Sequence, residues 1–297
     1  MKPVFFAFAG NERFTAAIAD ALACGTGQLE LRRFPDGESY LRYLTDVACR
    51  DVVLVCTLDR PDDKAIALYL AARTARELGA RRIGLVAPYL AYMRQDAKFR
   101  TGEGITSAHF AQFVCGFADW LITVDPHLHR HRSLDVIYTI PSTVVHAAPV
   151  ISEWISRNVT NPFVIGPDRE SEQWVAEVAH AAGCPYLVQQ KVRHGDRDVE
   201  ISLLEPSVLR GHTPVIVDDI VSTARTMIAA AAHLHEAGLQ PPVCIAAHPV
   251  FAGDSYAALR AAGVQQVVSC NTIAHESNEI DVSGLTADAI APFLTRG

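Results

Sequence analysis

Two adjacent carboxylates, Asp218 and Asp219, follow the apolar run Val215–Val217 and precede a hydroxyl-rich turn and an alanine-rich helical stretch. Neighbouring acids at the end of a buried strand repel each other and are costly to desolvate, so we expect them to hold a ligand. Free N–H groups at the start of a helix attract an anion, while carboxylates can accept hydrogen bonds from vicinal hydroxyls. This combination favours a sugar phosphate.

The turn between the acids and the helix would bind the phosphate. Its residues are Ser222, Thr223, Ala224, Arg225 and Thr226. The three hydroxyls of this turn would add donors to the backbone N–H groups. The simpler alternative is that Ser222 or Thr223 only caps the helix, but the two preceding acids favour a ligand.

Other polar residues also follow apolar stretches. They are Arg94, Gln95 and Lys98, then Asp125 and His127, and finally Asp168. Ligands of open parallel sheets bind beyond the carboxyl ends of the strands, so chemistry is expected at these positions. Cations beside an amide suit recognition of a triphosphate and an adenine. The simpler alternatives are a solvated loop for the first group and a helix cap for Asp168.

Three histidines, His127, His129 and His131, alternate along the chain and suggest zinc as an alternative. No cysteine or acidic partner completes a standard zinc set, so zinc is the weaker interpretation. We assign a function to His127 and expect the other two on the surface.

The elements that must position these residues alternate along the chain. Predicted strands are Val4–Ala9, Asp51–Leu58, Arg82–Tyr89, Trp120–Pro126, Pro162–Asp168, Pro214–Asp219, Pro242–Phe251 and Val264–Cys270; predicted helices include Asp62–Gly79, Glu170–Gly183 and Thr226–Gly238. Several helical patterns end at a glycine, as in Gly79, Gly183, Gly238 and Gly263. Repeated strand–helix–strand units predict an α/β fold with parallel sheets covered by helices on both faces. The pattern runs twice, which predicts domains 1–145 and 146–297.

Composition limits the classes of protein that fit. The 297 residues are 49% hydrophobic and carry a formal net charge of −7, which argues against a general nucleic-acid binder. No apolar run approaches the ~20 residues that cross a bilayer. The N-terminal run Val4–Ala9 is short and is followed by Glu12 and Arg13, so we expect a strand there and no export signal. The seven scattered cysteines contain no CxxC pair, which predicts reduced thiols and a cytoplasmic location.

The segment VIVDDIVSTARTM, residues 215–227, resembles the phosphoribosyl-diphosphate loop of type I phosphoribosyltransferases and of ribose-phosphate diphosphokinases. The segment RRFPDGESYLR, residues 32–42, resembles an element found in the diphosphokinases. In that family this hairpin contacts the adenine of ATP bound to a neighbouring subunit, which implies this role for Phe34, Asp36 and Glu38. Read without the resemblance, PDG is simply a turn between two strands.

Four more motifs follow in the order of the diphosphokinase family. RQDAK resembles its ATP-binding segment and implies that role for Arg94, Gln95 and Lys98. The Asp-x-His of Asp125 and His127, and the Pro-Asp that ends at Asp168, resemble segments near its magnesium ion, so the resemblance implies metal contacts for His127 and Asp168. The segment QQKVRHGDRDVEI, residues 189–201, resembles its catalytic loop, which implies contacts of Lys191 and Arg193 with the transferring group.

The resemblance implies two tandem phosphoribosyltransferase-like domains with a small β-flag, the first carrying ATP-binding elements and the second the ribose 5-phosphate loop. The implied reaction moves the diphosphoryl group of ATP, with Mg²⁺, to the 1-hydroxyl of ribose 5-phosphate and releases AMP. A homo-oligomer of two or more subunits is expected, with no nucleic acid or membrane as partner. Ser222 resembles the archaeal-type branch, whereas Arg225 departs from the small residue usual there. The alternatives are a phosphoribosyltransferase and a non-catalytic regulatory homologue.

Overall fold

The computed structural model describes residues 1–128, 130–166, 171–188, 191–194, 198–201 and 206–295, with the backbone alone for 173, 191–194, 198–201, 206 and 207. The chain forms two compact units. Unit 1 contains Met1–His146, Thr272–Ala274 and Ser283–Gly297, and unit 2 contains Ala147–Asn271 and His275–Val282.

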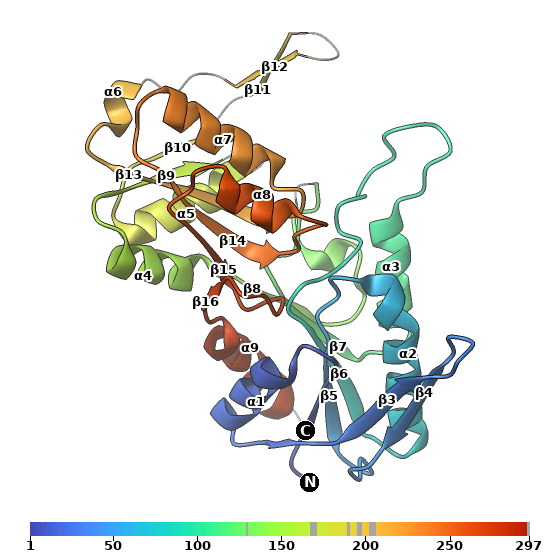
Figure 1. Cartoon of the computed structure of the whole chain (residues 1–297). Coiled ribbons are helices and arrows are strands. Elements are labelled where there is room, and N and C mark those ends of the chain that lie inside the picture. Colours follow the sequence, from blue (N-terminus) through green and yellow to red (C-terminus); the bar gives the residue numbers. More distant parts are fainter. Residues whose placement is uncertain (129, 167–170, 189–190, 195–197, 202–205, 296–297) are drawn as a thin grey trace. The chain divides into compact units, whose positions relative to one another are not determined.

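Unit 1 is built on a parallel sheet in the order β2-β1-β5-β6-β7-β8. Its strands are β1 (Val4–Ala7), β2 (Gly25–Thr26), β5 (Asp51–Val55), β6 (Arg82–Ala87), β7 (Trp120–Val124) and β8 (Ser142–Val145). Its helices are α1 (Glu12–Ala21), α2 (Pro61–Glu77), α3 (Thr106–Cys115) and α9 (Ser283–Thr295), with a short 3₁₀ helix η1 (Leu134–Val136). The α1–α9 pair and the α2–α3 pair lie on opposite faces of the sheet (Figure 1). The central strands are therefore buried on both faces, which explains their near-continuous apolar sequence.

A two-stranded antiparallel hairpin, β3 (Leu29–Arg33) and β4 (Ser39–Tyr43), also belongs to unit 1. Tyr43 anchors it: the hydroxyl donates to the carbonyl of Ala71 in α2 at 2.9 Å, and the ring lies edge-on to Phe6. Burial raises the pKa of Tyr43, so this phenol stays protonated and remains a donor. The base of the hairpin is thus fixed to the unit, and its turn projects from it.

Unit 2 repeats the architecture with a parallel sheet in the order β10-β9-β13-β14-β15-β16. Its strands are β9 (Pro162–Gly166), β10 (Tyr186–Val188), β13 (Thr213–Val221), β14 (Val243–Pro249), β15 (Gln266–Cys270) and β16 (Asn278–Ile280). Its helices are α4 (Ala148–Asn158), α5 (Glu172–Ala182), α6 (Pro206–Leu209), α7 (Arg225–Glu236) and α8 (Ser255–Ala261). The expected β-flag is the antiparallel pair β11 (Lys191–His194) and β12 (Asp198–Ile201).

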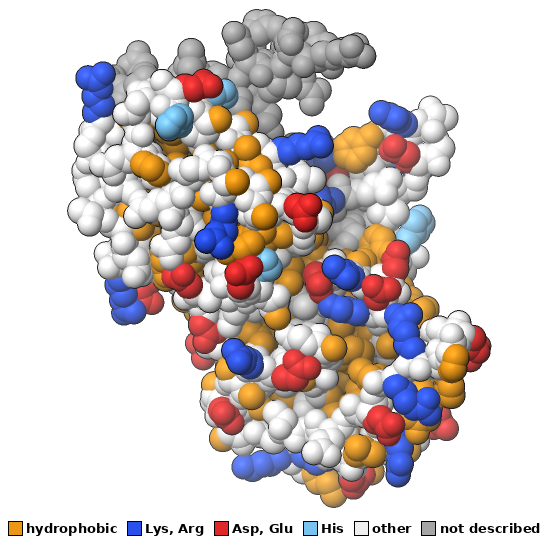
Figure 2. Space-filling view, viewed as in Figure 1, with side chains coloured by type: hydrophobic (Ala, Val, Ile, Leu, Met, Phe, Trp, Pro, Cys, Tyr) orange, Lys and Arg blue, Asp and Glu red, His pale blue; other side chains and the backbone are white. Residues whose placement is uncertain are grey.

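The predicted α/β class with two similar parallel-sheet units is confirmed. The glycines expected to end helices all adopt positive φ, between 67° and 89°, which a residue without Cβ tolerates best. All seven cysteines are free thiols. No described helix is long and apolar enough to cross a membrane. Lys/Arg and Asp/Glu side chains lie next to each other on the face drawn in Figure 2.

The division of the chain lies beside the predicted position 145/146, but the C-terminal segment differs from the prediction. Helix α9, which the expected domain 146–297 includes, packs in unit 1. Phe293 of α9 stacks on Trp120 with ring centroids 4.9 Å apart, and its carbonyl accepts from Arg82 Nη2 at 2.8 Å. No local sequence pattern predicts that α9 packs in unit 1, because the residues that it contacts lie far away in the sequence.

The packing of Trp120 across Gly84 gives a stability prediction. A Cβ on Gly84 would lie 1.9 Å from Cζ2 of Trp120, and both residues sit within buried strands. We expect Gly84→Ala to destabilise the protein by about 1–3 kcal/mol, because neither the strand nor the stacked indole can yield without moving α9. The thermal unfolding midpoint measures this.

The matched control is Gly284→Ala in α9. A Cβ on Gly284 meets no atom within 4 Å, and a helical Gly→Ala change gains about 1 kcal/mol at best. The midpoint should therefore fall for the first variant and stay or rise for the second. Equal midpoints in the two variants would show that the indole yields freely.

Candidate active site

The acid pair lies inside β13, which corrects the prediction that it ends the strand. Pairing with β14 continues past the acids, through Ile220 and Val221, because strand pairing uses backbone N–H and C=O groups, which the acidic side chains do not change. The other neighbour, β9, pairs only as far as Ile216. Among the described residues, Asp218 and Asp219 therefore occupy a length of β13 that is paired with β14 alone, beyond the last described pair with β9.

The two carboxylates are oriented by their own strand. Oδ1 of Asp218 accepts from the N–H of Asp219 at 3.0 Å, and Oδ1 of Asp219 accepts from the N–H of Ile220 at 2.8 Å. Both side chains are half-buried. Carboxylates fixed in this way are suited to accept hydrogen bonds from hydroxyl groups of a bound sugar.

The turn after β13 leads into the N-terminus of α7. Ala224, at the N-cap position, is buried and left-handed with φ +55°, and no side-chain cap hydrogen bond is made among the described residues. The capping alternative for Ser222 and Thr223 is therefore wrong. The first N–H groups of a helix have no partner within it, so this end of α7 can bind an anion.

The segment after β14 braces the turn from behind. The carbonyl of Ser222 accepts from the N–H of Ala252 at 2.9 Å and from the hydroxyl of Ser255 at 2.8 Å. Next to this brace, Phe251 has φ +24°. No sequence pattern indicated this support, because Ser255 lies far from the turn along the chain.

In unit 1, the segment Arg94–Lys98 follows β6 and is held by its own contacts. Tyr92, left-handed with φ +62°, packs against Phe110 at 4.7 Å and donates its hydroxyl to Asp62, which raises the pKa of the phenol. Gln95 Oε1 accepts from the hydroxyl of Thr106 at 3.2 Å. Arg94 and Lys98 are exposed beside this ordered amide, as a site for phosphates requires.

Asp125 and His127 follow the carboxyl end of β7. Asp125 is buried yet left-handed, with φ +31°, and its Oδ1 lies 3.1 Å from Nδ1 of His146. An aspartate in this conformation is strained by about 1–3 kcal/mol and persists where its surroundings hold it. His127, half-buried, lies two residues further on.

The turn of the β3–β4 hairpin presents the residues expected to contact adenine. Phe34 is 40% exposed and lies edge-on to Tyr40, while the guanidinium of Arg32 lies 3.9 Å from the Tyr40 ring centroid. Oδ1 of Asp36 accepts from the N–H of Glu38 at 3.2 Å, which closes the turn. The PDG turn is thus confirmed, and it carries a partly exposed aromatic ring over which the Arg32 guanidinium lies at 4.8 Å from the Phe34 centroid.

Some predicted residues lie beyond what can be described. Asp168 and His129 lie outside the described residues, and Lys191 and Arg193 have only their backbone described, in β11. The surface prediction for His131 is wrong, since the residue is half-buried and its Nε2 is fully covered. The described residues contain no group of three or more potential metal ligands.

The structure assembles the candidate residues within each unit. In unit 1 an ion pair links Asp96 of the 94–98 segment to Arg130, three residues after His127, which sequence reasoning did not single out. Unit 2 brings the acid pair to the anion-binding end of α7.

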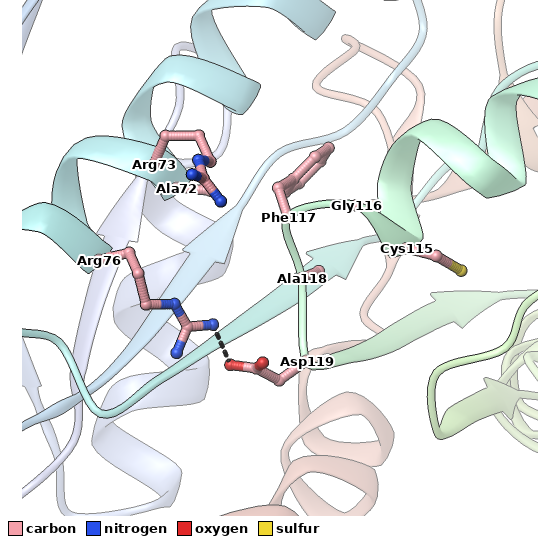
Figure 3. Close-up of a pocket in the computed structure, with 8 residues that line it drawn as sticks. All are labelled: Ala72, Arg73, Arg76, Cys115, Gly116, Phe117, Ala118 and Asp119. Atoms are coloured by element: carbon pink, nitrogen blue, oxygen red, sulfur yellow. Dashed lines mark hydrogen bonds and ion pairs between the residues drawn. The ribbon is translucent and has the colours of Figure 1, made fainter.

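A shallow cavity of about 90 Å³ in unit 1 is not part of these arrangements. Asp119 and Arg76 meet at its rim with 2.6 Å between Oδ2 and Nη2 (Figure 3). Asp119 directly precedes β7, so the cavity lies at the amino end of that strand, whereas Asp125 follows the carboxyl end. Ligands of parallel sheets bind at the carboxyl ends, so we assign this cavity no substrate.

The two parallel-sheet units, with acids that precede an uncapped helix N-terminus, define a phosphoribosyltransferase-type protein. The family model described as "N-terminal domain of ribose phosphate pyrophosphokinase" matches residues 4–116, and "Phosphoribosyl transferase domain" matches residues 133–284. The chain belongs to the ribose-phosphate pyrophosphokinase family and is a transferase.

Individual relatives agree with the family models. A ribose-phosphate pyrophosphokinase of Methanothermobacter thermautotrophicus is 30% identical over 94% of this chain and 97% of its own length. One of Saccharolobus solfataricus is 34% identical over 83% of this chain and 84% of its own. The crystal structure of phosphoribosylpyrophosphate synthetase from Mycobacterium smegmatis covers 100% of both chains with a TM-score of 0.86 at 21% identity, which shows the fold.

Proposed function

We propose that this chain transfers the diphosphoryl group of ATP to the 1-hydroxyl of ribose 5-phosphate, giving 5-phosphoribosyl 1-diphosphate and AMP. The observation that carries the proposal is the position of Asp218 and Asp219 in β13, past the last described pair with β9 and shortly before the N-terminus of α7. Relatives that span nearly the whole chain are named for this activity. The two acids take the ribose hydroxyls, and the turn from Ser222 to Thr226 takes the 5-phosphate.

ATP is bound by elements of unit 1. Arg94 and Lys98 contact the phosphates, and Gln95, oriented by Thr106, contacts the nucleotide. Phe34, Asp36 and Glu38 serve the adenine bound to a second copy of the chain, which makes the active form a homo-oligomer of two or more. The free thiols fit a reducing, cytoplasmic compartment, with no nucleic acid or membrane as partner.

We propose Mg²⁺ as the metal, with His127 and Asp168 near it. Mg²⁺ keeps several waters and takes one or two carboxylates plus substrate phosphates, so it needs no cage of protein ligands. The absence of such a cage among the described residues is compatible with that donor set. Bound with ATP, the ion would neutralise charge on the phosphate oxygens.

The reaction itself needs positioning and charge stabilisation more than covalent help. The 1-hydroxyl oxygen attacks the β-phosphorus of ATP and its proton is released to solvent, while the bond to the α,β-bridging oxygen breaks and AMP leaves with that oxygen. Lys191 and Arg193 hold the transferring diphosphoryl group through charge-assisted hydrogen bonds and help to exclude water from it.

Product analysis tests the proposal. The purified chain is incubated with ATP, MgCl₂ and ribose 5-phosphate, and AMP is followed by chromatography. AMP that forms only with all three present, together with a phosphoribosyl diphosphate peak, supports the reaction. ATP binding without AMP would instead indicate the regulatory homologue, and pyrophosphate release from phosphoribosyl diphosphate and a nucleobase would indicate a phosphoribosyltransferase.

Removal of the Arg225 side chain should have opposite effects on the stability of the free protein and on its affinity for ribose 5-phosphate. It is the first residue of α7, exposed, with no ion-pair partner among the described residues. A cation at a helix N-terminus costs about 0.3–1 kcal/mol, whereas beside a bound phosphate it is favourable. We expect Arg225→Ala to raise the unfolding midpoint of the free protein slightly and to weaken ribose 5-phosphate binding by roughly three- to tenfold.

Calorimetry with ribose 5-phosphate and thermal unfolding without ligand measure the two effects. Arg210→Ala in the same unit is the control for removal of an exposed arginine, and it should change neither quantity. Unchanged or tighter binding by the Arg225 variant would mean that Arg225 points away from the phosphate.

A further inference from the structure

Asp96 is a buried acid within the segment that carries three predicted ATP-binding residues. Its side chain is 1% exposed, and Oδ1 accepts from Nη1 of Arg130 at 2.8 Å. Oδ2 is buried without a hydrogen-bond partner among the described residues. Arg130 is therefore the single described group that compensates this charge, and a buried carboxylate without a compensating partner is strongly unfavourable.

Arg130 follows the other predicted segment of unit 1, residues 125–127, and lies three residues after His127. Its side chain is 49% exposed, and its guanidinium lies 5.1 Å from the ring centroid of Phe99. Arg130 thus contacts Asp96 within the 94–98 segment and Phe99 directly after it, on either side of Lys98 in the sequence. This ion pair therefore connects the two stretches.

We propose that Asp96 and Arg130 form a positioning pair that sets the 94–98 segment against the 125–127 segment for ATP binding. The proposal rests on the proposed function and deepens it. Neither residue touches the reacting atoms. When Arg130 is lost, the buried Asp96 carboxylate loses its described counter-charge and must move toward water, which displaces Arg94, Gln95 and Lys98 on the same segment. Misplacement of about 1 Å in such groups is costly.

The test compares Arg130→Gln, Asp96→Asn and the double variant with wild type. Arg130→Gln should raise KM for ATP by about tenfold and leave KM for ribose 5-phosphate within about twofold. The double variant should recover at least half of that loss on a logarithmic scale, because the neutral amide that replaces the Asp96 carboxylate needs no counter-charge. Arg132→Gln, the same change at an exposed residue two positions on, is the matched control and should resemble wild type.

A purely structural role would give a different pattern. Equal rises of both KM values, an Arg130 variant that matches the Arg132 control, or a double variant with no recovery would each overturn the proposal. Arg130→Lys keeps the charge with a single compact ammonium, so it should fold and raise KM for ATP only about threefold. No rise at all in that variant would also count against a guanidinium-specific contact.

Calorimetric titration with MgATP on the same variants separates this proposal from the proposed function. If wild type formed no AMP, the function would fail, but the order of ATP affinities, wild type above the double variant above Arg130→Gln, would still support the pair. If wild type formed AMP and the affinities did not follow that order, the pair alone would fail.

Discussion

Lys191→Ala is expected to lower turnover at least about a hundredfold while ATP affinity changes much less. Negative charge shifts among the phosphate oxygens as the diphosphoryl group moves from ATP to the sugar. A cation that contacts this group more strongly in the transition state than in the bound ATP lowers the barrier. Comparable cations in other phosphoryl transfers contribute about 10³–10⁵ in rate, so a hundredfold loss is a cautious expectation.

Lys191 shares its strand with the second predicted cation. It pairs with Ile201, and Arg193 pairs with Val199, in the antiparallel β11–β12 pair. The two residues are therefore two positions apart in one strand. Arg193→Ala should therefore have an effect of the same kind, and the double variant should lose less than the product of the two single losses.

Steady-state AMP formation at saturating ATP and ribose 5-phosphate measures the effect. Arg260→Ala, an exposed arginine of α8 in the same unit, is the control and should keep turnover within about twofold. Near-normal turnover in Lys191→Ala would remove Lys191 from the mechanism. A large loss of ATP affinity with unchanged turnover would make it a binding residue instead.

The architecture could be predicted because it depends on local properties. Val215–Val217 is apolar without alternation, and the structure buries it completely inside the sheet of unit 2. Helix ends could be placed at glycines, because a residue without Cβ accepts the left-handed conformation. The Asp-Asp segment and the PDG turn also stand out locally, so candidate residues in both units could be named.

Features that depend on distant partners could not be predicted. Apolarity stops at Asp218, but β13 continues to Val221 because β14 supplies hydrogen bonds there. Helix α9 returns to unit 1 because Trp120 and Arg82 receive Phe293. The pairing of Arg130 with Asp96 could not be predicted either, because the two residues lie far apart in the sequence.

Asp219→Asn, with Asp218→Asn as its companion, should lower kcat/KM for ribose 5-phosphate by about ten- to a hundredfold. A hydrogen bond to a charged acceptor contributes about 1.5–3 kcal/mol, and an amide accepts more weakly while keeping the shape of the side chain. KM for ATP should stay within about threefold, because the predicted ATP contacts belong to other segments.

The same substitution should not destabilise the free protein. Asn keeps the Oδ1 that accepts from the N–H of Ile220 and nearly the same shape, so the unfolding midpoint should stay near wild type. Asp254→Asn, at the N-cap of α8 where no side-chain cap bond forms, is the matched control and should leave both binding and midpoint near wild type.

Stabilisation by ligand distinguishes a binding role from a structural one. At a ribose 5-phosphate concentration of about a hundred times Kd, wild type gains about 2.7 kcal/mol, and a variant whose Kd rises a hundredfold gains only about 0.4 kcal/mol. The midpoint shift on adding ligand should therefore nearly vanish in Asp219→Asn while the midpoint without ligand holds. If instead the unfolding midpoint without ligand fell and the shift caused by ribose 5-phosphate remained, the acids would stabilise β13 and would not bind the sugar. If the shift vanished while the midpoint without ligand held, the acids would serve the sugar, because a ribose with two neighbouring hydroxyls offers a donor to each carboxylate.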